Sequence, residues 1–152
     1  MLEVTLAALH LIALGLGLGA VIQRGTALRD IPDVLSARRV FRADTLWGIA
    51  ALLWIITGVM RYTGTFEKGS AYYNGDSIFQ AKMVLLLVIV VLELWPMAKL
   101  MRWRKEIRRG GSPAVVLVPG TARIIATISH VQALLVILMV IAATALARGY
   151  SL

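Results

Sequence analysis

Residues 78–95 read IFQAKMVLLLVIVVLELW, and this stretch decides the fold. Residues 83–92 within it are all apolar. A helix needs about 20 mostly apolar residues to cross a hydrocarbon layer about 30 Å thick. With its flanks the run extends over Ile78–Leu100, with Pro96 near its end, and is long enough. We therefore predict a membrane-spanning helix here.

Three further apolar runs have similar length. They lie at about Leu2–Gln23, Thr45–Tyr62 and Ala122–Ala147. The whole chain is 59% hydrophobic with a mean hydropathy of +0.81, above the 45–50% apolar content of ordinary soluble domains. No repeat or linker divides it. The sequence thus predicts an all-α integral membrane four-helix bundle, a single transmembrane domain over residues 1–152, with Asp44 as the N-cap of its second span.

The charges are distributed unevenly among the connections. The first connection holds Arg24, Arg29, Arg38, Arg39 and Arg42, and the third holds Lys99, Arg102, Arg104, Lys105, Arg108, Arg109 and Arg123. The second holds only Arg61 and Lys68 beside Glu67 and Asp76. Because basic loops stay cytoplasmic, both termini are expected outside, in a bacterial-type cytoplasmic (inner) membrane.

The position of the basic residues in the connections also indicates the meaning of the net charge of +8. Cations between apolar runs favour contact with anionic lipid headgroups over binding of nucleic acid. Within the first connection, the segment from Ile31 to Phe41 is expected to form a short helix on the membrane surface. Trp95 and Trp103 are typical of interfacial anchors on the cytoplasmic side. The chain has no cysteine, which excludes disulfides and thiolate metal sites.

Ionisable residues inside spans are functional candidates, because each is costly in hydrocarbon. His10 lies about 12 Å and Lys82 about 6 Å below the outer boundary at 1.5 Å per residue. Arg61 ends the second span at that level, so we predict an outer cluster of these three residues. Glu93 lies about 7 Å and His130 about 12 Å above the inner boundary by the same count, and the two are expected to form an inner pair.

Helical spacing adds neighbours to these sites. His10, Ala13, Gly17 and Ala20 share one face, on which small residues let a helix or a flat ligand come close. Trp47, Trp54 and Arg61 form a second stripe. Each feature also has a structural interpretation: a histidine bonded to a neighbouring helix, a snorkelling Lys82, a headgroup contact of Arg61, or a helix end at Glu93.

Short motifs then suggest a family. Leu9-His10 in the first span and Phe79-Gln80-Ala81-Lys82 in the third resemble the CopD/HemJ-like four-span membrane proteins. Asp44-x-x-Trp47-Gly48, Gly58-x-x-Arg61 and Ala147-Arg148-Gly149 resemble an uncharacterised branch of predicted membrane proteins. The HemJ resemblance implies haem b on His10, with Lys82 as the other shared polar residue. Gly17 and Arg61 would then lie around the cofactor, and His130, which is extra to the family pattern, is the alternative iron ligand.

Three functions remain open from the sequence. The first is a haem-dependent membrane oxidoreductase in redox or porphyrin chemistry, with Lys82 and Arg61 holding propionates or an acidic substrate and a quinone or respiratory partner taking electrons. The second is a small-solute or proton-coupled carrier in which Glu93 and His130 relay protons. The third is an assembly subunit without chemistry. Whether copies of the chain form a homo-oligomer is also left open.

Overall fold

The computed structural model describes residues 1–29, 34–63 and 77–148, and in these ranges it contains five helices and no strand. The helices are α1 (Leu2–Ala27), α2 (Val34–Thr63), α4 (Ser77–Arg108), α5 (Pro113–Val116) and α6 (Pro119–Ala147). All but the short α5 are long and apolar enough to cross a membrane. The predicted all-α membrane bundle is confirmed.

The helices extend further than the apolar runs that predicted them. α1 continues past Gln23 to Ala27, and α4 continues past Pro96 to Arg108. Hydropathy marks only where the side chains stop being apolar, whereas a helix ends where its backbone hydrogen bonds end. Basic residues in the last turn of α4 favour this extension, because cations stabilise the negative end of the helix dipole.

Two predictions for the first connection were wrong. The segment expected to lie as a separate surface helix is instead the beginning of α2, from Val34 onward, while residues 31–33 lie outside the described ranges. Asp44 therefore lies in the interior of α2 and is not its N-cap. Its carboxylate takes part in contacts between helices.

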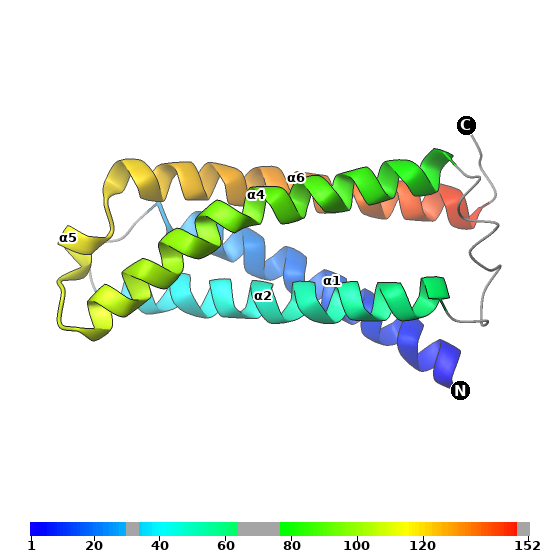
Figure 1. Cartoon of the computed structure of the whole chain (residues 1–152), viewed down its shortest axis with the longest axis horizontal. Coiled ribbons are helices and arrows are strands. Elements are labelled where there is room, and N and C mark those ends of the chain that lie inside the picture. Colours follow the sequence, from blue (N-terminus) through cyan, green and yellow to red (C-terminus); the bar gives the residue numbers. More distant parts are fainter. Residues whose placement is uncertain (30–33, 64–76, 149–152) are drawn as a thin grey trace.

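α1 lies obliquely to the other three long helices (Figure 1). It crosses behind α2 in this view and packs against both α2 and α6, while α4 packs mainly on α6. α2 and α4 touch each other little directly. The N-terminus lies at the same end as the last turn of α2 and the first turn of α4, and we call this the terminal end. The opposite end, with α5, is the basic end.

The buried apolar side chains form two separate cores. The first, in the middle and toward the terminal end, contains Ala13, Ala20, Val21, Trp47, Trp54, Ile89, Ala133, Val136 and Met139. The second, at the basic end, contains Leu28, Ala37, Val40, Leu100, Trp103, Leu117, Ala122, Ile125 and Ala126. Each long helix contributes residues to both cores. The stretch of helix between these two contributions carries polar side chains, which form a layer between the cores.

The close contact expected at Gly17 comes from α2. A Cβ on Gly17 would lie 3.3 Å from Cζ3 of Trp47 and 3.4 Å from Cβ of Ala50, whereas one on Gly19 would meet nothing within 4 Å. We expect Gly17→Leu to destabilise the bundle by about 1–3 kcal/mol through overpacking. The measurement is reversible unfolding in detergent. Gly19→Leu is the matched control, and equal stability of the two variants would contradict this packing.

Candidate functional site

A single guanidinium lies at the centre of the polar layer between the two cores. Arg24 is fully buried, at 0% exposure, near the end of α1. Its Nε donates to Oγ of Ser129 at 3.0 Å, and its terminal nitrogens donate to Glu93 at 2.6 and 2.8 Å. The same nitrogens also donate to Oδ1 of Asp44 at 3.1 Å and Oε1 of Gln132 at 2.9 Å. These five bonds match the five N–H donors of an arginine.

The partners of Arg24 also hold one another. Nε2 of Gln132 donates to Oε2 of Glu93 at 2.9 Å and to the carbonyl oxygen of Ile89 at 3.2 Å. Ser129 donates its own proton to the carbonyl of Ile125 at 2.8 Å, so its oxygen is oriented to accept from Arg24. The Glu93 carboxylate thus accepts a bidentate pair from Arg24 and a third bond from Gln132, the geometry of a strong charge-assisted contact.

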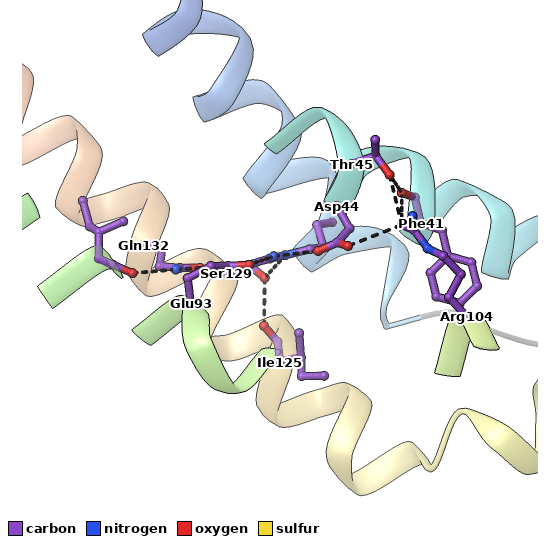
Figure 2. A network of polar contacts seen from close by, with 10 residues as sticks. Phe41, Asp44, Thr45, Glu93, Arg104, Ile125, Ser129 and Gln132 are labelled. Atoms are coloured by element: carbon purple, nitrogen blue, oxygen red, sulfur yellow. Dashed lines mark hydrogen bonds and ion pairs between the residues drawn. The ribbon is translucent and has the colours of Figure 1, made fainter. Parts of the chain in front are cut away.

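A second arginine extends the network toward the basic end. Figure 2 shows Asp44 between the Glu93 side of the network and Arg104. One terminal nitrogen of Arg104 lies 3.5 Å from Oδ2 of Asp44 and donates to the carbonyl of Phe41 at 2.9 Å and to Oγ1 of Thr45 at 3.0 Å. Two arginines and two carboxylates make the network neutral, which is what burial in hydrocarbon requires.

The sequence interpretation missed this centre. Arg24 was assigned to a basic loop because the apolar run ends at Gln23. The helical spacing of the residues before it nevertheless indicated a place inside the bundle. Arg24 continues the face of His10, Ala13, Gly17 and Ala20, being four residues beyond the last of them. A charge on the small-residue face of a span is expected to enter the bundle.

For the predicted inner pair of Glu93 and His130, the structure shows other direct partners, and contact between the two through one water stays a prediction. Glu93 bonds to Arg24 and Gln132, whereas Nδ1 of His130 lies 2.6 Å from the carbonyl oxygen of Ala126, one turn earlier on its own helix. No direct hydrogen bond joins Glu93 and His130, both of which lie in described helices. The His130 ring packs on α1 where a Cβ on Gly25 would be only 2.6 Å from Cε1.

His10 is positioned at the other end of the same α1 face. Its Nδ1 lies 2.9 Å from Oγ1 of Thr57, and its ring centroid is 5.8 Å from that of Trp54. The ring packs over Gly58, where a Cβ would lie 3.3 Å from Cε1. The imidazole is half-buried, and Thr57 is 2% exposed. The structure thus fixes this histidine between α1 and α2.

The other two members of the predicted outer cluster lie at the same end of the bundle. Arg61 follows Thr57 by one helical turn, and its neighbour Tyr62 stacks on Phe79 of α4 with centroids 5.6 Å apart. Nζ of Lys82 lies 5.9 Å from the centroid of that Phe79 ring. Arg61 and Lys82 therefore flank one aromatic contact, and their direct convergence with His10 stays a prediction.

The metal-ligand chemistry of the described residues is limited. In residues 1–29, 34–63 and 77–148 no group of three or more His, Asp or Glu side chains could hold a metal ion. A metal at His10 would thus need most of its ligands from another group, as the iron of a haem has.

A family model described as Predicted membrane protein (DUF2214) matches residues 2–151. The chain belongs to this family. No curated protein and no solved structure matches it. The expected place among predicted membrane proteins is confirmed, and kinship of this family with the CopD/HemJ-like proteins stays a prediction.

The network at Arg24 can be tested by removing one charge at a time. Arg24→Leu leaves two carboxylates buried without their cation, and we expect a loss of about 3–5 kcal/mol in the free energy of unfolding. Arg24→Lys should recover only part of the lost stability, because an ammonium cannot make the bidentate contact with Glu93. Reversible unfolding in detergent measures both.

Two further variants make that experiment specific. Arg29→Leu removes an exposed arginine one turn further on and should change stability little. Glu93→Leu combined with Arg24→Leu should be less destabilised than the sum of the two single variants, because neither charge is then left alone. If Arg24→Leu matched Arg29→Leu in stability, the network would not be holding the helices.

Proposed function

We propose that this membrane protein binds haem b through Nε2 of His10 and serves in redox or porphyrin chemistry. The observation that supports the proposal is the hydrogen bond between Nδ1 of His10 and Thr57. Haem-ligating histidines need one nitrogen held by an outer partner and the lone pair on the other.

The bonds of Thr57 favour the tautomer of His10 that carries its proton on Nδ1. The hydroxyl of Thr57 has one hydrogen, which is directed to the carbonyl oxygens of Leu53 at 2.8 Å and Trp54 at 3.1 Å. Its oxygen is therefore the acceptor of the bond with His10, and Nδ1 is the donor. A neutral imidazole with a protonated Nδ1 carries its lone pair on Nε2.

The surroundings of His10 fit a histidine that ligates haem iron, with the porphyrin on one side of the α1–α2 pair. The crevice between α1 and α2 next to His10 is too narrow even for water, so a macrocycle would lie outside it, on the half-exposed side of the imidazole. In a membrane that side would meet lipid, which suits an apolar ring. Arg61 and Lys82, half-buried at the same end, are placed to meet propionates or an acidic substrate.

A bound haem would supply one-electron chemistry in the membrane, with a quinone or a respiratory protein as electron partner. The chain's own part is to hold the imidazole. Thr57 fixes the proton on Nδ1, Gly58 leaves room for the ring, and Trp54 limits its rotation. The carrier alternative has less support, since no direct hydrogen bond joins Glu93 and His130 among the described contacts.

The absorption spectrum tests the proposal. Protein purified after haem-replete expression should show a Soret band, and His10→Ala should abolish it while the protein still inserts. Thr57→Val should lower haem affinity about 10- to 100-fold by removing the partner of Nδ1. Thr57→Ser, which retains the hydroxyl, is the matched control and should keep haem.

Each result has a defined meaning. Full haem in His10→Ala would move the ligand to His130, the other histidine of the chain. No haem in the wild-type protein would remove the redox proposal altogether. Arg61→Ala and Lys82→Ala should retain the ligand and lower the haem content or shift the spectrum.

We further propose that the basic end faces the cytoplasm in a bacterial-type inner membrane, with anionic lipid headgroups against it. Exposed cations on several elements support this: Arg29, Arg38, Arg39, Arg42, Arg102, Lys105, Arg108, Arg109 and Arg123. The terminal end with His10 would then face outward.

Cysteine labelling measures this orientation. The chain has no cysteine, so single-cysteine variants need no prior removal. A membrane-impermeant maleimide added outside should label Tyr72→Cys, in a segment outside the described ranges, and leave Ser112→Cys unlabelled. Labelling of Ser112→Cys alone would reverse the orientation and place His10 in the cytoplasmic half.

A further inference from the structure

Two indole N–H groups in the middle of the bundle have no hydrogen-bond partner within the part of the chain that the structure describes. Trp47 and Trp54 are 3% and 7% exposed, and the Nε1 atom of each is buried without a partner among the described residues. The buried polar side chains of Arg24, Ser129 and Gln132 are all bonded. Buried donors are normally paired, so two unpaired ones on one helix face point to a missing acceptor.

Both indoles line one crevice between α1 and α2. Its wall includes Ala13 and Gly17 from α1, Ala50 from α2 and Val136 from α6. None of the residues lining it, apart from the two tryptophans, has a polar side-chain atom, and the backbone there belongs to unbroken helices. The residues that line the crevice thus offer no side-chain acceptor to either indole.

Water does not fill this role in the observed packing. The crevice does not admit a water-sized sphere, and a single water would find few polar partners in its wall. The lining residues Leu14 and Ala51 are half-buried, so the crevice reaches the outer surface of the helix pair there. An acceptor would enter from that side, by displacement of the Leu14 side chain.

We propose that this crevice binds the carbonyl oxygen of an apolar, membrane-soluble molecule, which accepts a hydrogen bond from an indole N–H of Trp47 or Trp54. Seven residues of helix separate the two indoles by about 10.5 Å, so one oxygen serves one donor. The rest of the molecule is apolar, because the small side chains of the wall offer only van der Waals contact.

Two classes of molecule in a membrane carry such an oxygen. One is the ring carbonyl of an isoprenoid quinone, and the other is the acyl ester carbonyl of a phospholipid. The site is separate from the His10 ligand position, although Trp54 lies beside His10. The binding of a carbonyl here does not depend on haem.

The indole protons themselves report the bond. The full chain is placed in nanodiscs of ether-linked phospholipid, which has no ester carbonyl, and the four indole N–H resonances are assigned with Trp→Phe variants. A short-chain ubiquinone is added in one arm, and ester-linked phospholipid replaces the ether lipid in the other. We expect a downfield shift of the Trp47 or Trp54 resonance in at least one arm, and none for Trp95.

The two arms distinguish the sources. A shift with quinone assigns a quinone carbonyl, and a shift with ester lipid alone assigns a lipid ester. In the responding arm, Trp47→Phe or Trp54→Phe should weaken binding about tenfold, the loss expected for one hydrogen bond, whereas Trp95→Phe, at an exposed position on α4, should not.

Two results would overturn the proposal: no shift of either indole in both arms, or unchanged binding in both phenylalanine variants. Neither depends on the Soret band, so failure here and failure of haem binding are distinguishable.

Discussion

The arrangement of the helices depends on the neutralisation of Arg24 inside the bundle. A guanidinium at membrane depth costs about 2.5–3.5 kcal/mol on insertion scales unless it is partnered. Here its partners come from each of the other three long helices: Asp44 from α2, Glu93 from α4, and Ser129 and Gln132 from α6. Because a replacement apolar core could be equally stable, we infer that the network mainly specifies which helix faces meet and at what depth.

This constraint accounts for the contact pattern of the bundle. α2 and α4 pack little against each other directly, yet the carboxylates of Asp44 and Glu93 meet the same guanidinium on α1. The polar layer also separates the two apolar cores, so that a shift of any helix by one turn would place a charge in a core and an apolar side chain in the layer. Apolar packing in a membrane lacks such register information, since lipid is as apolar as the side chains.

The sequence predicted the number and nature of the helices because hydrocarbon thickness sets their length. It failed at the helix ends, since hydropathy cannot show that α1 continues to Ala27 or that α2 begins at Val34. That error hid the site, because Arg24 and Asp44 both lie in the turns that were assigned to a loop or a cap. Depth alone paired Glu93 with His130, whereas the direction of each side chain around its helix pairs Glu93 with Arg24. The spacing of four residues from Ala20 was the available clue.

One face of α1 organises both ends of the molecule. His10 and Arg24 are separated by 14 residues, or about 21 Å along the helix, and both contact side chains of α2. Between them Gly17 and Ala20 keep the face small, which lets the Trp47 ring lie against the backbone. The close approach is necessary for both contacts, because a bulky side chain at Gly17 would separate α1 from α2 and move Thr57 away from His10 and Asp44 away from Arg24. The small-residue face is thus what allows α1 to hold a polar contact to α2 at each end, and the buried indoles between them are a consequence of filling that narrow space with large rings.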